Sequence, residues 1–194
     1  MKDIPQFAAI LCLVALIAAA SLSWINEITE PKIASQEMKA LNEGLQAVLP
    51  GASKGSIVPV KKAGNISYYI GYHDPEQRKR IGYAFEASGD GYSSTIRTLV
   101  GVDTTGTILA IHVLSQQETP GLGTRCQEIR PGESHPWWQA QFKGLNASDV
   151  RVDKDGGIIE SITGATITSR AITNAIAEKA TAVMQELPSG KQTE

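Results

Sequence analysis

The sequence predicts an α+β fold: an antiparallel sheet with packed helices, preceded by one N-terminal transmembrane helix. Three observations support this prediction. An uncharged apolar segment lies near the N-terminus, stretches rich in β-branched and aromatic residues follow in the middle, and an apolar stripe with helical spacing lies near the C-terminus. Because short turns separate the strand-like stretches, the sheet is expected to be antiparallel, with helices over one face.

The apolar segment at residues 7–25 carries no charged side chain. A helix rises about 1.5 Å per residue, so roughly 20 such residues cross the hydrocarbon core of a bilayer. Trp24 lies at the far end of the segment, where an indole ring favours the membrane interface. Lys2 precedes the segment and acidic residues follow it. This asymmetry favours a cytoplasmic N-terminus, residues 1–6, and a main domain on the opposite side of the membrane.

A cleaved signal peptide is the alternative interpretation of the same segment. The small residues from Ala18 to Ser21 offer a cleavage site of the A-x-A type. The region before the segment is poor in positive charge, because Asp3 offsets Lys2, and this favours a retained anchor. Either interpretation exports the main domain across the membrane.

The rest of the chain divides into three parts. Residues 26–51 have apolar side chains near helical spacing and end at Pro50-Gly51, which predicts a helical connector. Residues 52–187 form the main, extracytoplasmic domain. We expect residues 188–194 to be a flexible tail.

The middle of the main domain reads as a series of hairpins. Four strands are predicted, at residues 66–73, 80–87, 94–103 and 107–116. Residues 89–91 and 103–106 are turn sequences that separate the last three strands. Strands joined by such short turns pair in antiparallel fashion.

A long irregular stretch, residues 118–145, follows the strands and contains three prolines and four glycines. Loops of this length in a compact domain are usually functional or disordered. The aromatic residues Trp137, Trp138 and Phe142 argue against disorder. A helix is predicted at residues 169–187, where apolar side chains form one stripe.

Composition and motif searches exclude several classes of function. The formal net charge is −2, with 20% charged residues, which leaves no basic surface for nucleic acid. His73, His112 and His135 are far apart and form no ligand-spaced pair, so no metal site is predicted. No nucleophile stands beside an obvious base, and no glycine-rich phosphate loop is present. We therefore predict no catalytic residue. Cys12 in the apolar segment and Cys126 in the main domain cannot form an internal disulfide.

The stretch at residues 163–169, Thr-Gly-Ala-Thr-Ile-Thr-Ser, carries the strongest chemical signal. Gly164 and Ala165 leave the backbone uncovered, so that a bulky group can approach it. The free N–H groups and the positive dipole end of the following helix would stabilise a phosphate. A threonine hydroxyl at this position has two alternative roles. It either caps the helix, as hydroxyls commonly do, or contacts a phosphate as donor or ester partner.

Two segments resemble a known family. Residues 160–166 resemble the flavinylation motif of exported FMN-binding domains, in which an acidic residue precedes [ST]-G-A-T. Residues 103–124 resemble the second hallmark of that family, a strand that leads into an E-T-P-G-L-G loop. Together with the N-terminal membrane helix and the length of 194 residues, they make the chain similar to the G subunits of the Rnf ion-translocating electron-transport complexes.

The resemblance implies one FMN, joined through its phosphate to Thr166 as a phosphoester and installed from FAD by a dedicated flavin transferase. Glu160 stands where the motif usually has aspartate. The resemblance places further cofactor-binding residues around the attachment site and beside the flavin ring, where contacts are mostly apolar or through the backbone. These are Thr163, Gly164, Ala165, Thr168 and Ser169 in the first group, and Glu118, Thr119, Pro120, Gly121 and Leu122 in the second.

The resemblance also implies a function. The chain would be a single-pass, electron-transfer subunit in the bacterial inner membrane, with its main domain on the periplasmic side. It would relay electrons within a ferredoxin:NAD oxidoreductase coupled to ion translocation, beside other membrane and iron–sulfur subunits, rather than act as an enzyme alone. One alternative is the C subunit of the sodium-translocating NADH:quinone reductase, or a stand-alone exported flavoprotein. An alternative of another class is a non-redox, membrane-anchored assembly subunit in which the threonines only cap a helix.

Overall fold

The computed structural model describes most of the chain: residues 4–53, 55–62, 64–74, 76 and 79–187. The predicted tail at residues 188–194 therefore lies outside the described part, as do residues 1–3. The chain divides into two units, Met1–Leu41 and Asn42–Glu194.

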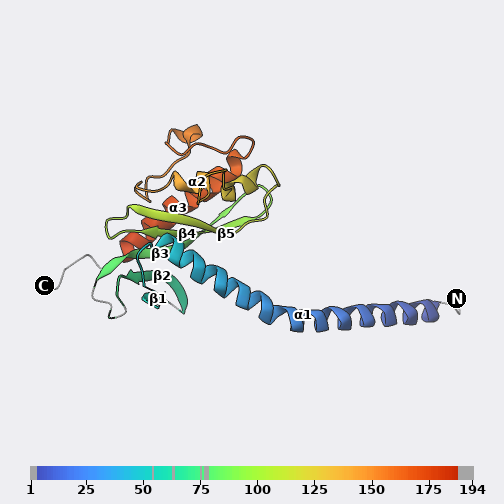
Figure 1. Ribbon diagram of the computed structural model, residues 1–194. Helices are drawn as coiled ribbons and strands as arrows, with labels where there is room; N and C mark the ends of the chain where they lie inside the picture. Colours follow the sequence, from blue (N-terminus) through green and yellow to red (C-terminus); the bar gives the residue numbers. More distant parts are fainter. Residues whose placement is uncertain (1–3, 54, 63, 75, 77–78, 188–194) are drawn as a thin grey trace. The chain divides into compact units, whose positions relative to one another are not determined.

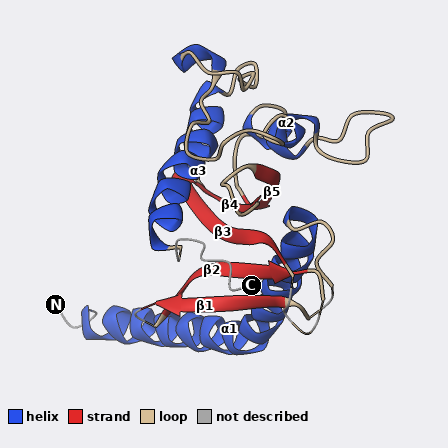
Figure 2. Cartoon of the chain, turned by 90° about the vertical axis from the view of Figure 1, so that its left-hand side faces the viewer, coloured by secondary structure: helices blue, strands red, loops and turns tan. Residues whose placement is uncertain are grey.

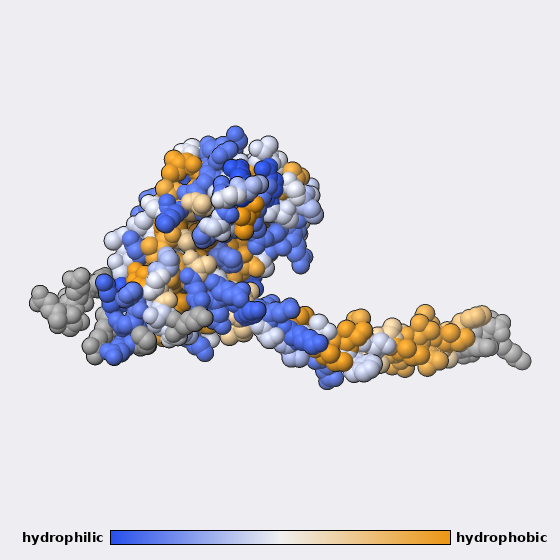
Figure 3. Space-filling view, in the orientation of Figure 1, coloured by the Kyte–Doolittle hydropathy of each residue, from blue (hydrophilic) through white to orange (hydrophobic). Residues whose placement is uncertain are grey.

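The first unit is the N-terminal part of one long helix, α1, which runs from Ile4 to Val48 (Figure 1). The predicted membrane segment and most of the predicted connector lie on this helix, which continues through Pro31. Its most apolar window has a mean hydropathy of 2.4 and is not buried inside the structure. On the face drawn in Figure 3, apolar side chains, coloured orange, gather along this part of α1. It is long and apolar enough to cross a membrane, and with the following sheet it confirms the predicted fold class.

The second unit is built on a five-stranded sheet in the order β1-β2-β3-β4-β5, with every neighbouring pair antiparallel (Figure 2). The strands are β1 (Ile57–Lys62), β2 (Asn65–Tyr72), β3 (Arg80–Asp90), β4 (Thr95–Val102) and β5 (Ile108–Ser115). The last four correspond to the predicted strands. The first, β1, is absent from the prediction because Pro59 and two lysines obscure its pattern. As an edge strand it tolerates a proline, which lacks an N–H to donate.

The turn predicted at residues 89–91 was misplaced, because β3 continues to Asp90, which pairs with Thr95. Gly89 is there for a different reason. A Cβ atom on Gly89 would lie 2.3 Å from the carbonyl oxygen of Ala171. That oxygen belongs to the last helix, α3 (Thr166–Glu186), which crosses β3 at this point. The glycine thus permits close packing of helix on strand rather than a reversal of the chain.

One face of the sheet and α3 enclose the main hydrophobic core. Side chains that alternate along β3 and β4, including Phe85 and Val100, meet Ile172 and Ile176 from α3. The irregular region after β5 completes this core with the short 3-10 helix η1 (Gly123–Gln127) and α2 (Trp137–Ala140). It is ordered around Trp138, which is fully buried and whose indole Nε1 donates to the carbonyl oxygen of Glu160 at 2.8 Å.

The opposite face of the sheet is covered by the last turn of α1, which belongs to the second unit. Leu45, Val48 and Leu99 are buried there. The backbone of the helix lies directly on β4, because a Cβ atom on Gly101 would be 1.9 Å from the carbonyl oxygen of Val48. The sheet is therefore a middle layer, with α3 and the irregular region on one side and the end of α1 on the other.

Candidate functional site

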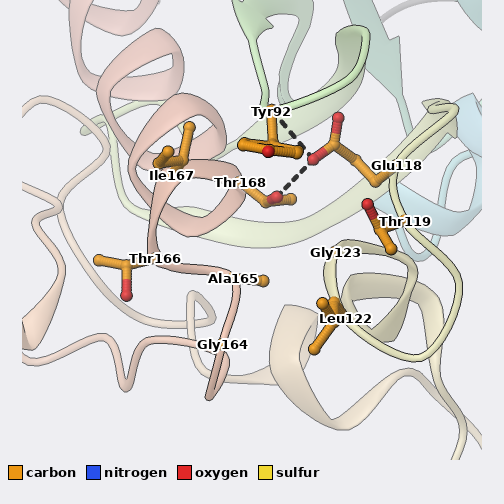
Figure 4. A pocket seen from close by; sticks show the side chains of 10 residues that line it. All are labelled: Tyr92, Glu118, Thr119, Leu122, Gly123, Gly164, Ala165, Thr166, Ile167 and Thr168. Carbon is orange, nitrogen blue, oxygen red and sulfur yellow. Dashed lines mark hydrogen bonds between the residues drawn. The ribbon is translucent and has the colours of Figure 1, made fainter.

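A cavity of about 690 Å³ opens at the end of the sheet where α3 begins (Figure 4). Three segments form its walls: the turn between β3 and β4, the loop after β5, and the first turn of α3. The lining residues are Tyr92, Glu118, Thr119, Leu122, Gly123, Gly164, Ala165, Thr166, Ile167 and Thr168. The volume is in the range of sites that bind cofactor-sized molecules. Both sequence motifs therefore meet at one cavity.

The turn before α3 gives Thr166 its position. Gly164 has φ of +79°, a conformation that side chains with a Cβ atom rarely adopt, and the N–H of Ala165 donates to the carbonyl oxygen of Ile162 at 2.9 Å. The hydroxyl of Ser169 connects the two ends of this turn, because it donates to the carbonyl oxygen of Ala165 and accepts from the N–H of Ile162, both at 3.0 Å. Ser169 is thus buried behind the turn and does not line the cavity.

Thr166 is the first residue of α3 and lies half-buried in the cavity wall. The residue before the helix is Ala165, and no side-chain hydrogen bond caps the helix. The prediction that α3 begins at Ser169 was therefore wrong, and neither Thr166 nor the exposed Thr163 acts as the cap. The first N–H groups of a helix have no intrahelical acceptor, so they remain available to an anion placed beside Thr166.

The carboxylate of Glu118 is buried at the centre of the site and makes a dense set of hydrogen bonds. Its Oε2 accepts from the hydroxyl of Thr168 at 2.5 Å and from the N–H of Tyr92 at 3.0 Å. Its Oε1 accepts from the N–H groups of Ser93 at 2.9 Å and Ser94 at 3.1 Å. Figure 4 shows the carboxylate directed toward Tyr92 and Thr168. Glu118 lines the cavity, while its carboxylate is hydrogen-bonded by groups of the protein itself.

These hydrogen bonds shift the ionisation of Glu118. Burial alone would raise the pKa of its carboxyl group, but the hydroxyl of Thr168 and the three N–H groups outweigh burial and lower the pKa below its ordinary value. The carboxylate is therefore ionised at neutral pH, and its ionised form stabilises the folded state.

We expect this stabilisation to depend on pH with a defined sign. Because the folded-state pKa of Glu118 is below the unfolded value, the contribution is fully present above the unfolded pKa, about 4.3. It is lost as the pH falls through the folded-state pKa. The difference in melting temperature between the wild type and E118Q should be constant from about pH 6 to 8 and shrink below about pH 4. Thermal unfolding of both chains in detergent measures this difference in melting temperature. A difference that does not shrink in acid would contradict the lowered pKa of Glu118.

Three large apolar side chains also line the cavity. Tyr92, Leu122 and Ile167 are 72%, 42% and 51% exposed. They account for half of the exposed large apolar side chains among the described residues from 42 to 187, the others being Ile66, Ile129 and Ile158. Their concentration at one cavity indicates a ligand with a large apolar surface.

Sequence reasoning missed three of the lining residues: Tyr92, Gly123 and Ile167. An aromatic residue within the turn sequence Gly91-Tyr92-Ser93-Ser94 was an available signal for the first. Gly123 could not be assigned without the fold. A Cβ atom at Gly123 would lie 2.6 Å from Cβ of Glu118 and 2.8 Å from the hydroxyl of Thr168. Conversely, Thr163, Pro120 and Gly121 were predicted to bind the cofactor and lie outside the cavity lining.

Ionisable groups elsewhere give no sign of metal binding. Among the residues that the structure describes, no three His, Cys, Asp or Glu side chains cluster in a way that could hold a metal ion. Cys126 is buried in η1, and burial raises the pKa of its thiol to about 12, so that the thiol stays protonated. The chemistry available at the site is thus that of hydroxyl groups, helix N–H groups and an apolar surface.

Comparisons with known proteins match both the N-terminal part and the main domain of the chain. Residues 91–181 match the family model of the FMN-binding domain, and residues 1–48 match that of the RnfG N-terminal region. The G subunit of the ion-translocating oxidoreductase complex of Pasteurella multocida is 34% identical over 96% of both chains. The G subunit of the Na⁺-translocating ferredoxin:NAD⁺ oxidoreductase complex of Acetobacterium woodii is 28% identical over 90% of this chain and 89% of that one. The crystal structure of Shewanella oneidensis NqrC has a TM-score of 0.46 and 19% identity, covering 71% of this chain and 73% of that chain.

Proposed function

Because this chain belongs to the family of G subunits of ion-translocating oxidoreductase complexes, we propose that it is the membrane-anchored subunit that relays electrons in such a complex, through one FMN joined covalently to Thr166. The complex would be a ferredoxin:NAD⁺ oxidoreductase, as the name of the Acetobacterium woodii relative describes. The match of residues 91–181 to the FMN-binding domain supports FMN as the cofactor.

The observation that carries this proposal is the division of the cavity into a polar and an apolar part. Thr166 and the uncapped start of α3 provide a hydroxyl and free N–H groups, which suit a phosphate. Tyr92, Leu122 and Ile167 provide exposed apolar surface, which suits an aromatic ring. FMN consists of these two parts, a phosphate at one end and a flat ring system at the other. The residues present therefore fit this cofactor.

The covalent link would form by transfer from FAD, catalysed by a flavin transferase. The hydroxyl oxygen of Thr166 attacks the phosphorus of the FMN half of FAD. A new bond joins this oxygen to phosphorus, the bond from phosphorus to the AMP half breaks, AMP leaves, and the hydroxyl proton is released. Attachment through the phosphate leaves the ring free to rest against the apolar wall.

When bound, FMN supplies the redox chemistry by accepting electrons and passing them on. The residues of this chain bind and orient it: the start of α3 holds the phosphate, and the apolar side chains shield the ring from water. No general acid or base is needed for this relay. A covalent link also prevents loss of the cofactor in a compartment that holds no free FMN to replace it.

The chain is membrane-anchored through α1. We place this anchor in the inner membrane of a bacterium, with residues 52–187 on the periplasmic side, because charge asymmetry around residues 7–25 favours that orientation. The partners would be the other membrane subunits and the iron–sulfur subunits of the complex.

The match of residues 1–48 to the RnfG N-terminal region supports a G subunit over the C subunit of the sodium-translocating quinone reductase or a stand-alone flavoprotein. The uncapped start of α3 argues against a subunit in which the threonines only cap a helix.

Intact-mass measurement tests the proposal. The full-length chain is produced with and without a flavin transferase and purified in detergent. With the transferase, we expect the mass to increase by one FMN less one water, and the denatured band to fluoresce under ultraviolet light. Peptide mapping should place the added mass on the peptide that contains Thr166. An unmodified chain in the presence of an active transferase would refute covalent attachment.

A further inference from the structure

Glu118 joins three segments that are far apart in the sequence. It follows β5, and its carboxylate binds N–H groups of the turn between β3 and β4, about 25 residues earlier, and the hydroxyl of Thr168, 50 residues later. These are the three segments that form the walls of the cavity. Without Glu118, no hydrogen bond among the described residues would connect the turn at Tyr92 with the first turn of α3.

The surroundings of Glu118 require an ionised carboxylate rather than any polar side chain. Three of the groups that face it are backbone N–H groups, which can only donate. A glutamine amide at this position would replace one of the two acceptor oxygens with an NH₂ group, which cannot accept from the backbone N–H groups. The site also allows little room for an alternative arrangement, since a Cβ atom on Gly91 would lie 2.6 Å from Oε1 of Glu118. Both flanking glycines, Gly91 and Gly123, therefore serve the approach of this one side chain.

The two outer partners of Glu118 lead directly to the proposed cofactor site. Thr168 lies in the same helical turn as Thr166, so its hydrogen bond to Glu118 holds the start of α3 against the loop. Tyr92 contributes an exposed ring to the cavity wall, while its backbone N–H is held by the same carboxylate oxygen. Hydrogen bonds to the buried carboxylate of Glu118 therefore fix the positions of both Thr166 and the apolar wall at Tyr92.

We propose that Glu118 is a positioning residue: it holds the start of α3 and the turn at Tyr92 in register, so that Thr166 is presented for flavin attachment and the ring meets a preformed wall. This inference rests on the proposed function. It also predicts an electrostatic effect, because a fixed negative charge beside the cavity disfavours the addition of an electron to a group bound there. Removal of the charge should raise the reduction potential of the attached flavin.

The test compares four full-length chains with the wild type, each produced with the transferase: E118Q, E118D, T168V and the control V183A. Val183 is buried in α3, far along the helix from the cavity, so V183A reduces stability without touching the site. We expect E118Q to slow attachment, followed by intact mass over time, by roughly tenfold, and T168V by a smaller factor. E118D, which keeps the charge, should recover part of the rate. V183A should be modified at the wild-type rate.

Potentiometric titration of the attached flavin provides a second measurement that a loss of stability would not move. The potential should rise in E118Q and stay unchanged in V183A. E118Q that is modified at the wild-type rate with an unchanged potential would overturn the proposal. So would equal slowing in E118Q and V183A at matched melting temperatures. If E118Q fails to fold, the test rests on T168V. Flavin attachment to T168V at the wild-type rate would then refute the positioning role of Glu118. An unmodified wild type would instead refute the proposed function.

Discussion

Replacing Thr166 with alanine is expected to abolish flavin attachment and leave the fold intact. The hydroxyl oxygen is the proposed bonding atom, so its removal leaves nothing to esterify. Thr166 is half-buried, and its hydroxyl makes no hydrogen bond among the described residues. Alanine at the first position of a helix costs little, so the free energy of unfolding should change by less than about 0.5 kcal/mol. Intact mass, in-gel flavin fluorescence and thermal unfolding measure the three expectations.

Two further variants test whether the loss of flavin is due to the missing hydroxyl of Thr166. T166S retains the hydroxyl and should still accept flavin. T163A removes another threonine hydroxyl from the same turn, but Thr163 is exposed and outside the cavity lining. It should therefore be modified like the wild type. Flavin that persists on T166A would show that the attachment residue has been misidentified.

Replacing Gly101 with alanine should cause a large loss of stability. A Cβ atom at this position would lie 1.9 Å from the carbonyl oxygen and 2.6 Å from the carbonyl carbon of Val48. Both are backbone atoms, so the end of α1 must move away from β4. The contacts of Leu45, Val48 and Leu99 on that face would be disturbed as well. We expect the free energy of unfolding to fall by about 3 kcal/mol, at the upper end for overpacked sites.

Gly132 offers a contrasting control. It has φ of +87°, and a Cβ atom there would meet no other atom within 4 Å. G132A should therefore cost only the strain of a left-handed alanine, about 1 kcal/mol. Chemical unfolding of the two variants measures the difference. A similar small loss in both would mean that α1 does not lie against Gly101 as closely as the structure indicates.

Local patterns in the sequence were sufficient for the elements of the fold. The apolar segment, four of the five strands and the stripe along α3 could be recognised because each depends on periodicity within a few residues. The strand β1 was not recognised, because Pro59 and two lysines interrupt its apolar pattern. The two motifs could likewise be found by their order of residue types, and they named Thr166 and the loop at residues 118–122.

The contacts of the candidate site join residues that are far apart in the sequence, so no local sequence pattern predicts them. Gly89 reads as a turn residue, and its real constraint is the backbone of α3 crossing β3. Ser169 was placed near the flavin attachment site by the motif, and its hydroxyl closes the turn that precedes the helix. Glu118 and Thr168 are 50 residues apart and meet through a hydrogen bond of 2.5 Å. Such pairs form only when sheet, loop and helix pack together, because packing rather than sequence proximity brings donor and acceptor within reach.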